Sequence, residues 1–224
     1  MRKELENVEV FHHGDELTPE TIGQKNEMRL PTNIPMSNWI RAQFEDGYQG
    51  WALDVGASDG RFINSTWDLE RNHRWTVLSV EANPLMKPLL VSERAFIEIC
   101  AVGTEEADDV DFHVHLDSLE AFSALKPVSN NPKYQPGARW GIVKTKVRRA
   151  DTLLAKWQFP RLDALCVDVE GGELDVLNSI DIPKWSPRVI VLESWKQGEF
   201  DEYMKARGYQ RFWRSADNDC YVRV

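Results

Sequence analysis

Short apolar runs alternate with amphipathic stretches from residue 51 onward. The runs have the length and composition of β-strands and occupy residues 51–55, 75–81, 95–103, 161–170 and 188–195, and helix-like stretches separate several of them. The run at 161–170 is nearly continuous, as in strands that are covered on both faces of a parallel sheet. The pattern therefore predicts an α/β fold, with a mostly parallel sheet and helices on both of its faces.

The pattern changes at both ends of the chain. Residues 1–50 read as a polar lead-in segment with one short amphipathic helix at 36–44, and residues 51–224 as the main domain. The last apolar segments predict a C-terminal antiparallel hairpin. Residues 109–116 alternate as a further strand, which we expect at a sheet edge. The stretch 117–140 holds three prolines and predicts a long irregular loop, of the kind that often serves a binding site.

Composition narrows the class of protein. With 42% hydrophobic and 28% charged residues the 224-residue chain is an ordinary globular one. Its net charge of −9 disfavours nucleic acid as a partner. Three cysteines favour a reducing compartment, and no apolar stretch has the length of a signal or a membrane span. We expect a cytoplasmic protein without membrane insertion, whose oligomeric state the sequence leaves open.

Ligands of doubly wound sheets bind beyond the carboxyl ends of the strands, so the residues after each apolar run are candidates for a site. The first run leads into DVGASDG at residues 54–60. Glycine at 56 and 60 would let the backbone pass close to a ligand. A dinucleotide fingerprint is disfavoured, because Ser58 and Arg61 stand where it needs glycine.

Two other interpretations of this turn remain. Gly-Ala-Ser58-Asp-Gly has the form of the nucleophile elbow of a serine hydrolase. Such an enzyme needs a histidine late in the chain, and none follows His115. The second interpretation is the loop that binds S-adenosylmethionine, which has no pyrophosphate to clamp and tolerates other residues at the middle positions.

Acidic residues end the later runs. Glu81 follows the glycine turn by about 20 residues, the spacing at which a carboxylate accepts hydrogen bonds from ribose hydroxyls. Asp168, Glu170 and Glu173 lie within six residues, although like charges at close range cost energy. They either cap the following helix or form a site; the site interpretation is favoured for Asp168 and Glu170 and stays open for Glu173. Glu193 ends the next run.

The blocks DVGASDG, VEANP and VDVEGGELDVL, in this order and spacing, resemble the FkbM family of S-adenosylmethionine-dependent methyltransferases over residues 51–195. The resemblance implies a class I, Rossmann-like fold with a seven-stranded sheet. It also implies O-methylation of a hydroxyl on a sugar, glycan or natural product. Two positions depart from the family pattern, because Ser58 stands where the family usually has Asn and Cys166 where it usually has Lys.

The same resemblance implies the site. S-adenosylmethionine would be the cofactor and S-adenosylhomocysteine the product; the first motif would line the methionine end of the cofactor, Glu81 would hold its ribose, and Asp168 and Glu170 would lie beside the transferable methyl group. The expected cofactor-binding residues are Asp54, Gly56, Ala57, Ser58, Gly60, Glu81, Ala82, Asn83, Ala101, Ser123 and Asp168.

Asp168 or Glu170 is the expected general base, because neighbouring like charges raise the pKa of a carboxyl toward the range useful near neutral pH. His113 or His115 would assist, unless both serve only in packing. Oxygen ligands from Asp168, Glu170 and Glu193 suit Mg²⁺, but we favour a site without metal.

The acceptor is expected to be a small molecule or glycan, shaped in part by residues 117–140, with Trp140 as a platform for a sugar ring. N-methylation of a small molecule or peptide is the first alternative, and a serine hydrolase that uses Ser58 is the second.

Overall fold

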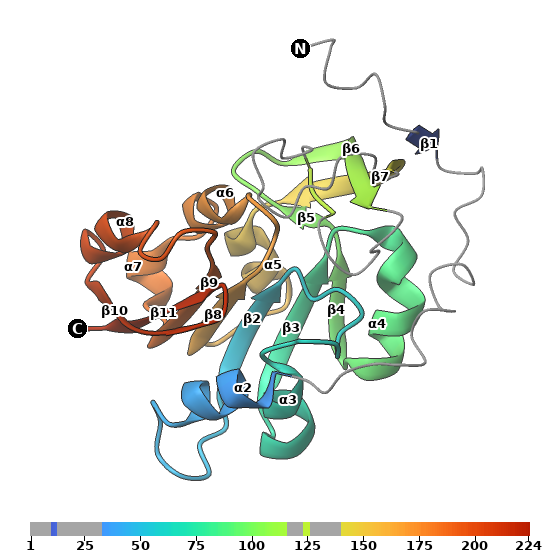
Figure 1. Ribbon diagram of the computed structural model, residues 1–224. Coiled ribbons are helices and arrows are strands. Elements are labelled where there is room, and N and C mark those ends of the chain that lie inside the picture. Colours follow the sequence, from blue (N-terminus) through green and yellow to red (C-terminus); the bar gives the residue numbers. More distant parts are fainter. Residues whose placement is uncertain (1–9, 13–32, 116–122, 126–139) are drawn as a thin grey trace.

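A computed structural model describes residues 10–12, 33–115, 123–125 and 140–224 of the chain. The described part is built around two sheets, as Figure 1 shows. A seven-stranded sheet runs through the centre, and a smaller four-stranded sheet lies above it in this view.

In the seven-stranded sheet the strand order is β10-β11-β9-β8-β2-β3-β4. Only β11 runs antiparallel to its neighbours, whereas the other strands run parallel to one another. Strand β2 lies between β3 and β8, so the order reverses beside β2, at the switch point where doubly wound sheets bind ligands. The strands are β2 (Trp51–Val55), β3 (Thr76–Glu81), β4 (Phe96–Ile99), β8 (Ala164–Val167), β9 (Val189–Glu193), β10 (Tyr209–Ser215) and β11 (Asn218–Arg223).

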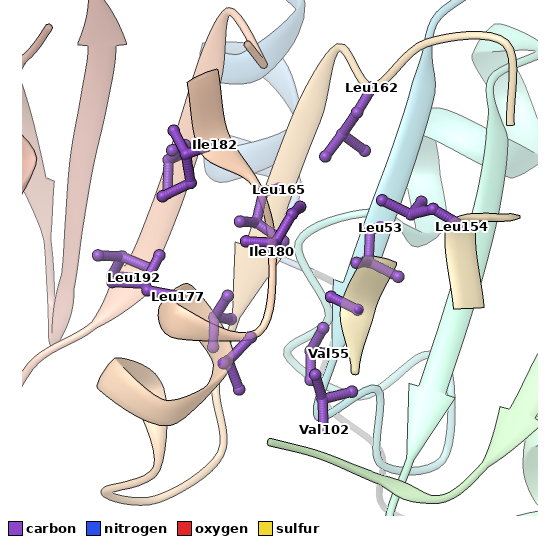
Figure 2. Packing of buried hydrophobic residues seen from close by; sticks show 14 of the residues in the cluster. Leu53, Val55, Val102, Leu154, Leu162, Leu165, Leu177, Ile180, Ile182 and Leu192 are labelled. Atoms are coloured by element: carbon purple, nitrogen blue, oxygen red, sulfur yellow. The ribbon is translucent and has the colours of Figure 1, made fainter. Parts of the chain in front are cut away.

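Alternate residues of each strand serve two separate cores, since successive side chains point to opposite faces of a sheet. Leu53 and Val55 face one core, which Figure 2 shows, and Ala52 faces the other. The first core is covered by α5 (Ala150–Lys156), α6 (Glu173–Asn178), α7 (Ile182–Trp185) and α8 (Asp201–Lys205). The second is covered by α2 (Ile34–Arg41) and α3 (Trp67–His73). Helix α2 lies inside the expected lead-in segment, yet Met36 and Ile40 are part of this core.

The smaller sheet corrects one expected strand. The run 95–103 does not form a single strand, because the chain bends at Cys100; β4 ends at Ile99, and the residues that follow pair with β7 instead. The expected edge strand near 109–116 also lies in the smaller sheet, where it pairs with β7. The strands of this sheet are β1 (Val10–His12), β5 (Ala101–Val102), β6 (Ala107–His115) and β7 (Trp140–Arg148).

Packing fixes the smaller sheet against the end of β3. A 3₁₀ helix, η2 (Pro84–Met86), and helix α4 (Lys87–Glu93) follow β3. Leu85 and Met86 pack against apolar side chains of β6 and β7. The hydroxyl of Thr145 on β7 donates to the carbonyl oxygen of Ala82 at 2.7 Å. The loop after β3 is therefore held from both sheets.

The predicted α/β architecture is confirmed, with a mostly parallel seven-stranded sheet, helices on both faces and a C-terminal antiparallel hairpin. The expected loop at 117–140 lies outside the described residues, apart from 123–125 and Trp140. No helix in the described ranges has the length and apolar character needed to span a bilayer.

Candidate active site

A cavity of about 520 Å³ opens at the carboxyl ends of β2, β3, β8 and β9. Its further walls are the segment between β2 and α3, residues 123–125 and the tip of the β10–β11 hairpin. The expected site residues that line it are Asp54, Gly56, Ala57, Ser58, Glu81, Ala82, Asn83, Ala101, Ser123, Asp168 and Glu170. Of the expected cofactor-binding residues, Gly60 alone does not line this pocket.

Gly56 lies where the loop after β2 crosses the end of β8. Its φ is 87°, and a Cβ at this position would stand 1.6 Å from the carbonyl oxygen of Asp168. The N–H groups of Gly56 and Ala57 both donate to the carbonyl oxygen of Val80. Glycine is therefore required by the close approach of two loops, which brings the first and third sequence motifs into one pocket.

The space beside Gly60 belongs to the protein and not to a ligand. A Cβ here would stand 2.8 Å from Cγ of Arg94 and 2.9 Å from Cδ1 of Leu90. The interpretation that a side chain at 60 would occupy cofactor space is therefore corrected, because α4 and the residue after it fill that space.

Glu81 ends β3 with its carboxylate fixed by backbone donors. The N–H of Ser58 donates to Oε2 and the N–H of Asn83 to Oε1, each at 2.7 Å. Burial raises the pKa of Glu81, while these hydrogen bonds act in the opposite direction. Both oxygens keep lone pairs for further donors, which is what two ribose hydroxyls would require.

Ser58 has a φ of 51°, in the left-handed region where Asn is enriched among non-glycine residues. The backbone thus explains why Asn suits the position at which this chain departs from the family pattern.

A buried ion pair lies below the pocket. Nη2 of Arg94 stands 2.8 Å from Oδ2 of Asp54, and the Arg94 side chain is 0% exposed. The same guanidinium stands 3.3 Å from Glu70 and donates to the hydroxyl of Ser79 at 2.7 Å. The charge of Asp54 is therefore balanced inside the protein, and this carboxylate is not free to receive a cationic ligand by itself.

The sequence offers no signal for Arg94, which follows an ordinary polar helix end. Its partner Asp54 lies 40 residues earlier in the chain. Only the folded arrangement of β2 and α4 brings the two together.

Three carboxyl groups meet at the ends of β8 and β9. One oxygen from each of Asp168, Glu170 and Glu193 lies within 4.8 Å of the others. Asp168 lines the pocket, and the walls of the pocket surround it. This burial, together with the charges of Glu193 and Glu170, raises the pKa of Asp168 well above the ordinary value. Such a cluster binds a proton more readily than an isolated carboxyl group, and its oxygens also suit a divalent cation.

Glu173 serves its own loop and does not line the pocket. Its Oε1 accepts from the N–H of Val169 at 3.2 Å and of Gly171 at 3.0 Å. The residue is 6% exposed, and burial raises the pKa of its carboxyl to about 7. Of the three acids in the third motif, Glu173 is therefore the one that stabilises the start of the helix and is not part of the pocket.

The structure places His113 and His115 in the smaller sheet, and neither lines the pocket. Burial lowers the pKa of His113 below its ordinary value, and His115 packs edge-on against Trp140, with ring centroids 4.9 Å apart. Trp140 is 6% exposed at the start of β7. The expectation that Trp140 offers an open platform to a sugar ring is therefore wrong.

Two further wall segments were missed from sequence. Residues 62–65, between β2 and α3, line the pocket without any apolar periodicity that would mark them. The hairpin tip, residues 216–218, lines it from the other side. It is held by the N–H of Ser194, which donates to Asp217 at 2.7 Å, and by Arg214, which pairs with Asp219 at 2.9 Å.

Sheet order and site together define a class I, Rossmann-like methyltransferase fold. A family model described as the methyltransferase FkbM domain matches residues 54–211, which is more than half of the chain. The chain therefore belongs to the FkbM methyltransferase family, as the resemblance of its motifs implied.

Solved structures of similar fold share little sequence with the chain. The FkbM methyltransferase from Methylobacillus flagellatus KT is 14% identical with a TM-score of 0.49, over 94% of this chain and 49% of that one. Precorrin-6y C5,15-methyltransferase from Geobacter metallireducens GS-15 is 11% identical with a TM-score of 0.43, over 85% and 88%. The N-terminal domain of human METTL16, in complex with S-adenosylhomocysteine, is 10% identical with a TM-score of 0.40, over 93% and 70%.

The chain spans about half the length of the Methylobacillus protein. No curated protein matches it in sequence.

Replacing Arg94 tests the buried ion pair. Arg94→Met leaves Asp54 buried without its cationic partner, so we expect the free energy of unfolding in urea to fall by about 3 kcal/mol or more. Lys144→Met is the control, because it removes the exposed pair with Asp111 and should cost less than about 1 kcal/mol. Equal losses in the two variants would contradict this account.

Glu173→Gln tests the raised pKa of the buried carboxyl. Because the folded-state pKa of about 7 lies above the ordinary 4.5, Glu173 stabilises the fold below about pH 4.5, and this contribution is lost as the pH rises through 7. The variant resembles the protonated acid, so relative to wild type it should gain about 3 kcal/mol in unfolding free energy at pH 8 and less than about 1 kcal/mol at pH 5. Exposed Glu202→Gln should show no such difference, and a gain independent of pH would refute the assignment.

Proposed function

We propose that the protein transfers the methyl group of S-adenosylmethionine to a hydroxyl of a small-molecule or glycan acceptor. The observation that carries this proposal is the crossing at Gly56, which sets the carboxylate of Glu81 and the cluster around Asp168 in one pocket. The three free, buried cysteines agree with the cytoplasmic location that we also propose.

The donor set fits this cofactor. Glu81 offers two oriented oxygens for the ribose hydroxyls. The cluster around Asp168 is negative, which suits a sulfonium and an ammonium group. The cavity of about 520 Å³ falls in the range of small-molecule sites.

Asp168 is the proposed general base. Bound S-adenosylmethionine supplies an electrophilic methyl group; Asp168, open to the pocket at the end of β8, accepts the proton of the acceptor hydroxyl as the new bond forms. Burial and the charges of Glu193 and Glu170 raise the pKa of Asp168, which makes this carboxylate a stronger base. Glu170 is the second candidate for the same role.

N-methylation is the alternative that one observation favours. None of the described lining residues is Lys, Arg or His, whereas seven are acidic. An amine acceptor that becomes cationic on methylation would be stabilised there. The hydrolase alternative has no such support, because the same set of lining residues gives Ser58 no histidine.

Calorimetric titration with S-adenosylhomocysteine tests the cofactor assignment. We expect one site per chain in the wild type and about tenfold or weaker binding in Glu81→Gln, which loses charged hydrogen bonds to the ribose. Glu202→Gln is the matched control on the far end of the sheet. Absence of binding by the wild type would refute the proposal.

Asp168→Asn tests the base. The variant keeps the shape of the side chain but cannot take the proton, so methyl transfer to a hydroxyl acceptor should fall about 100-fold or more. Binding of S-adenosylhomocysteine should persist in the same variant. A mass-detected acceptor screen with wild type, Asp168→Asn and Glu170→Gln gives the comparison, and undiminished turnover in Asp168→Asn would exclude this role.

A further inference from the structure

Among the described residues that line it, the pocket has no cationic side chain for the carboxylate of the cofactor. Its acidic lining residues are Asp54, Glu81, Asp168, Glu170, Asp175, Glu193 and Asp217, and no lining residue in the described ranges is basic. The ammonium and sulfonium of S-adenosylmethionine suit such walls, but its α-carboxylate is repelled by them. Among the described residues, neutral donors at a distance from these acids are therefore the better place for this carboxylate.

The segment between β2 and α3 provides neutral donors. Within the described part of the chain, the N–H of Ile63, the N–H of Ser65 and the Ser65 hydroxyl have no acceptor. Both residues line the pocket. The N–H groups of Gly56, Ala57 and Ser58 are already paired with Val80 or Glu81, so the start of the loop is not available to an anion.

Hydrogen bonds hold this segment in place before any ligand arrives. Nδ2 of Asn64 donates to Oδ2 of Asp54 at 2.9 Å, and Oδ1 of Asn64 accepts from the N–H of Thr66 at 2.9 Å. The hydroxyl of Ser37 on α2 donates to the carbonyl oxygen of Ser65 at 2.7 Å. The Ser65 peptide is thereby tied on one side to α2 and on the other to the end of β2, so its donors need little reorganisation to bind.

Charge favours the same place. Asp54, the acid next to this segment, is paired with Arg94 at 2.8 Å, so it repels an anion less than an acid without a cationic partner would. In the sheet, β2 lies between β3, which carries Glu81, and β8, which leads to Asp168. A cofactor that reaches from the ribose acid to the base must cross β2, beside this segment.

We propose that the N–H groups of Ile63 and Ser65 and the hydroxyl of Ser65 bind the α-carboxylate of S-adenosylmethionine. This inference rests on the proposed function, since it assigns one part of the cofactor to one part of that pocket. It makes Ser65 a residue that recognises the amino acid end of the cofactor and leaves the adenosine end unaffected.

Two ligands separate the contributions in calorimetric titrations without acceptor. S-adenosylhomocysteine carries the carboxylate, and its decarboxylated analogue keeps the adenosine, the sulfur and the amine. Ser65→Ala should weaken S-adenosylhomocysteine about tenfold through loss of a hydrogen bond to a charged group, with no change for the analogue. Ser65→Thr should retain the wild-type ratio of affinities, and Ser92→Ala, an exposed serine of α4, is the matched control.

Ser65→Asp gives the sharper test, because a carboxylate at this position should repel S-adenosylhomocysteine and favour the cationic analogue, so that the order of the two affinities reverses. Equal losses for both ligands, or none, in Ser65→Ala and Ser65→Asp would overturn the inference while leaving the cofactor assignment intact. If wild type binds neither ligand, the proposed function itself fails.

Discussion

The crossing of the β2 loop over the end of β8 is the constraint on which the rest of the pocket depends. A Cβ at Gly56 would stand 1.6 Å from the carbonyl oxygen of Asp168, so the two backbones meet directly. Val80 accepts from the loop on one side, and the N–H of Asp168 donates to Val55 on the other. The carboxyl ends of β3, β2 and β8 are thus joined, and Glu81 and Asp168 flank β2 at the point where the strand order reverses.

The acids of this pocket lie in different surroundings. Arg94 pairs with Asp54, and two backbone N–H groups hold the carboxylate of Glu81. In the cluster around Asp168, burial and the charges of Glu193 and Glu170 raise the pKa of Asp168. Asp54 and Glu81 are therefore paired before any ligand binds, and a bound cation would reduce the repulsion between the carboxyl groups at the end of β8.

Motifs at strand ends were predictable because apolar runs mark the strands and parallel strands end at one edge. Features that depend on residues far away in the chain could not be predicted from these motifs. The break at Cys100 follows from pairing with β7, the burial of Trp140 follows from contact with His115 on β6, and Arg94 finds its partner 40 residues away. Glu173 shows the same limit within one motif, since only the fold reveals that its carboxylate turns back onto Val169 and Gly171.

The two departures from the family pattern differ in weight. Ser58 has a φ of 51°, in the left-handed region. Asn adopts this conformation more readily than Ser, and in this chain the hydrogen bonds of the loop maintain it. Cys166 lies buried in β8, where burial raises the pKa of its thiol, so it stays neutral where a lysine would bring a positive charge. At this position the chain therefore adds no positive charge to the cluster around Asp168. Under the proposed function, cofactor affinity and the basicity of Asp168 therefore depend on the charges of the same cluster.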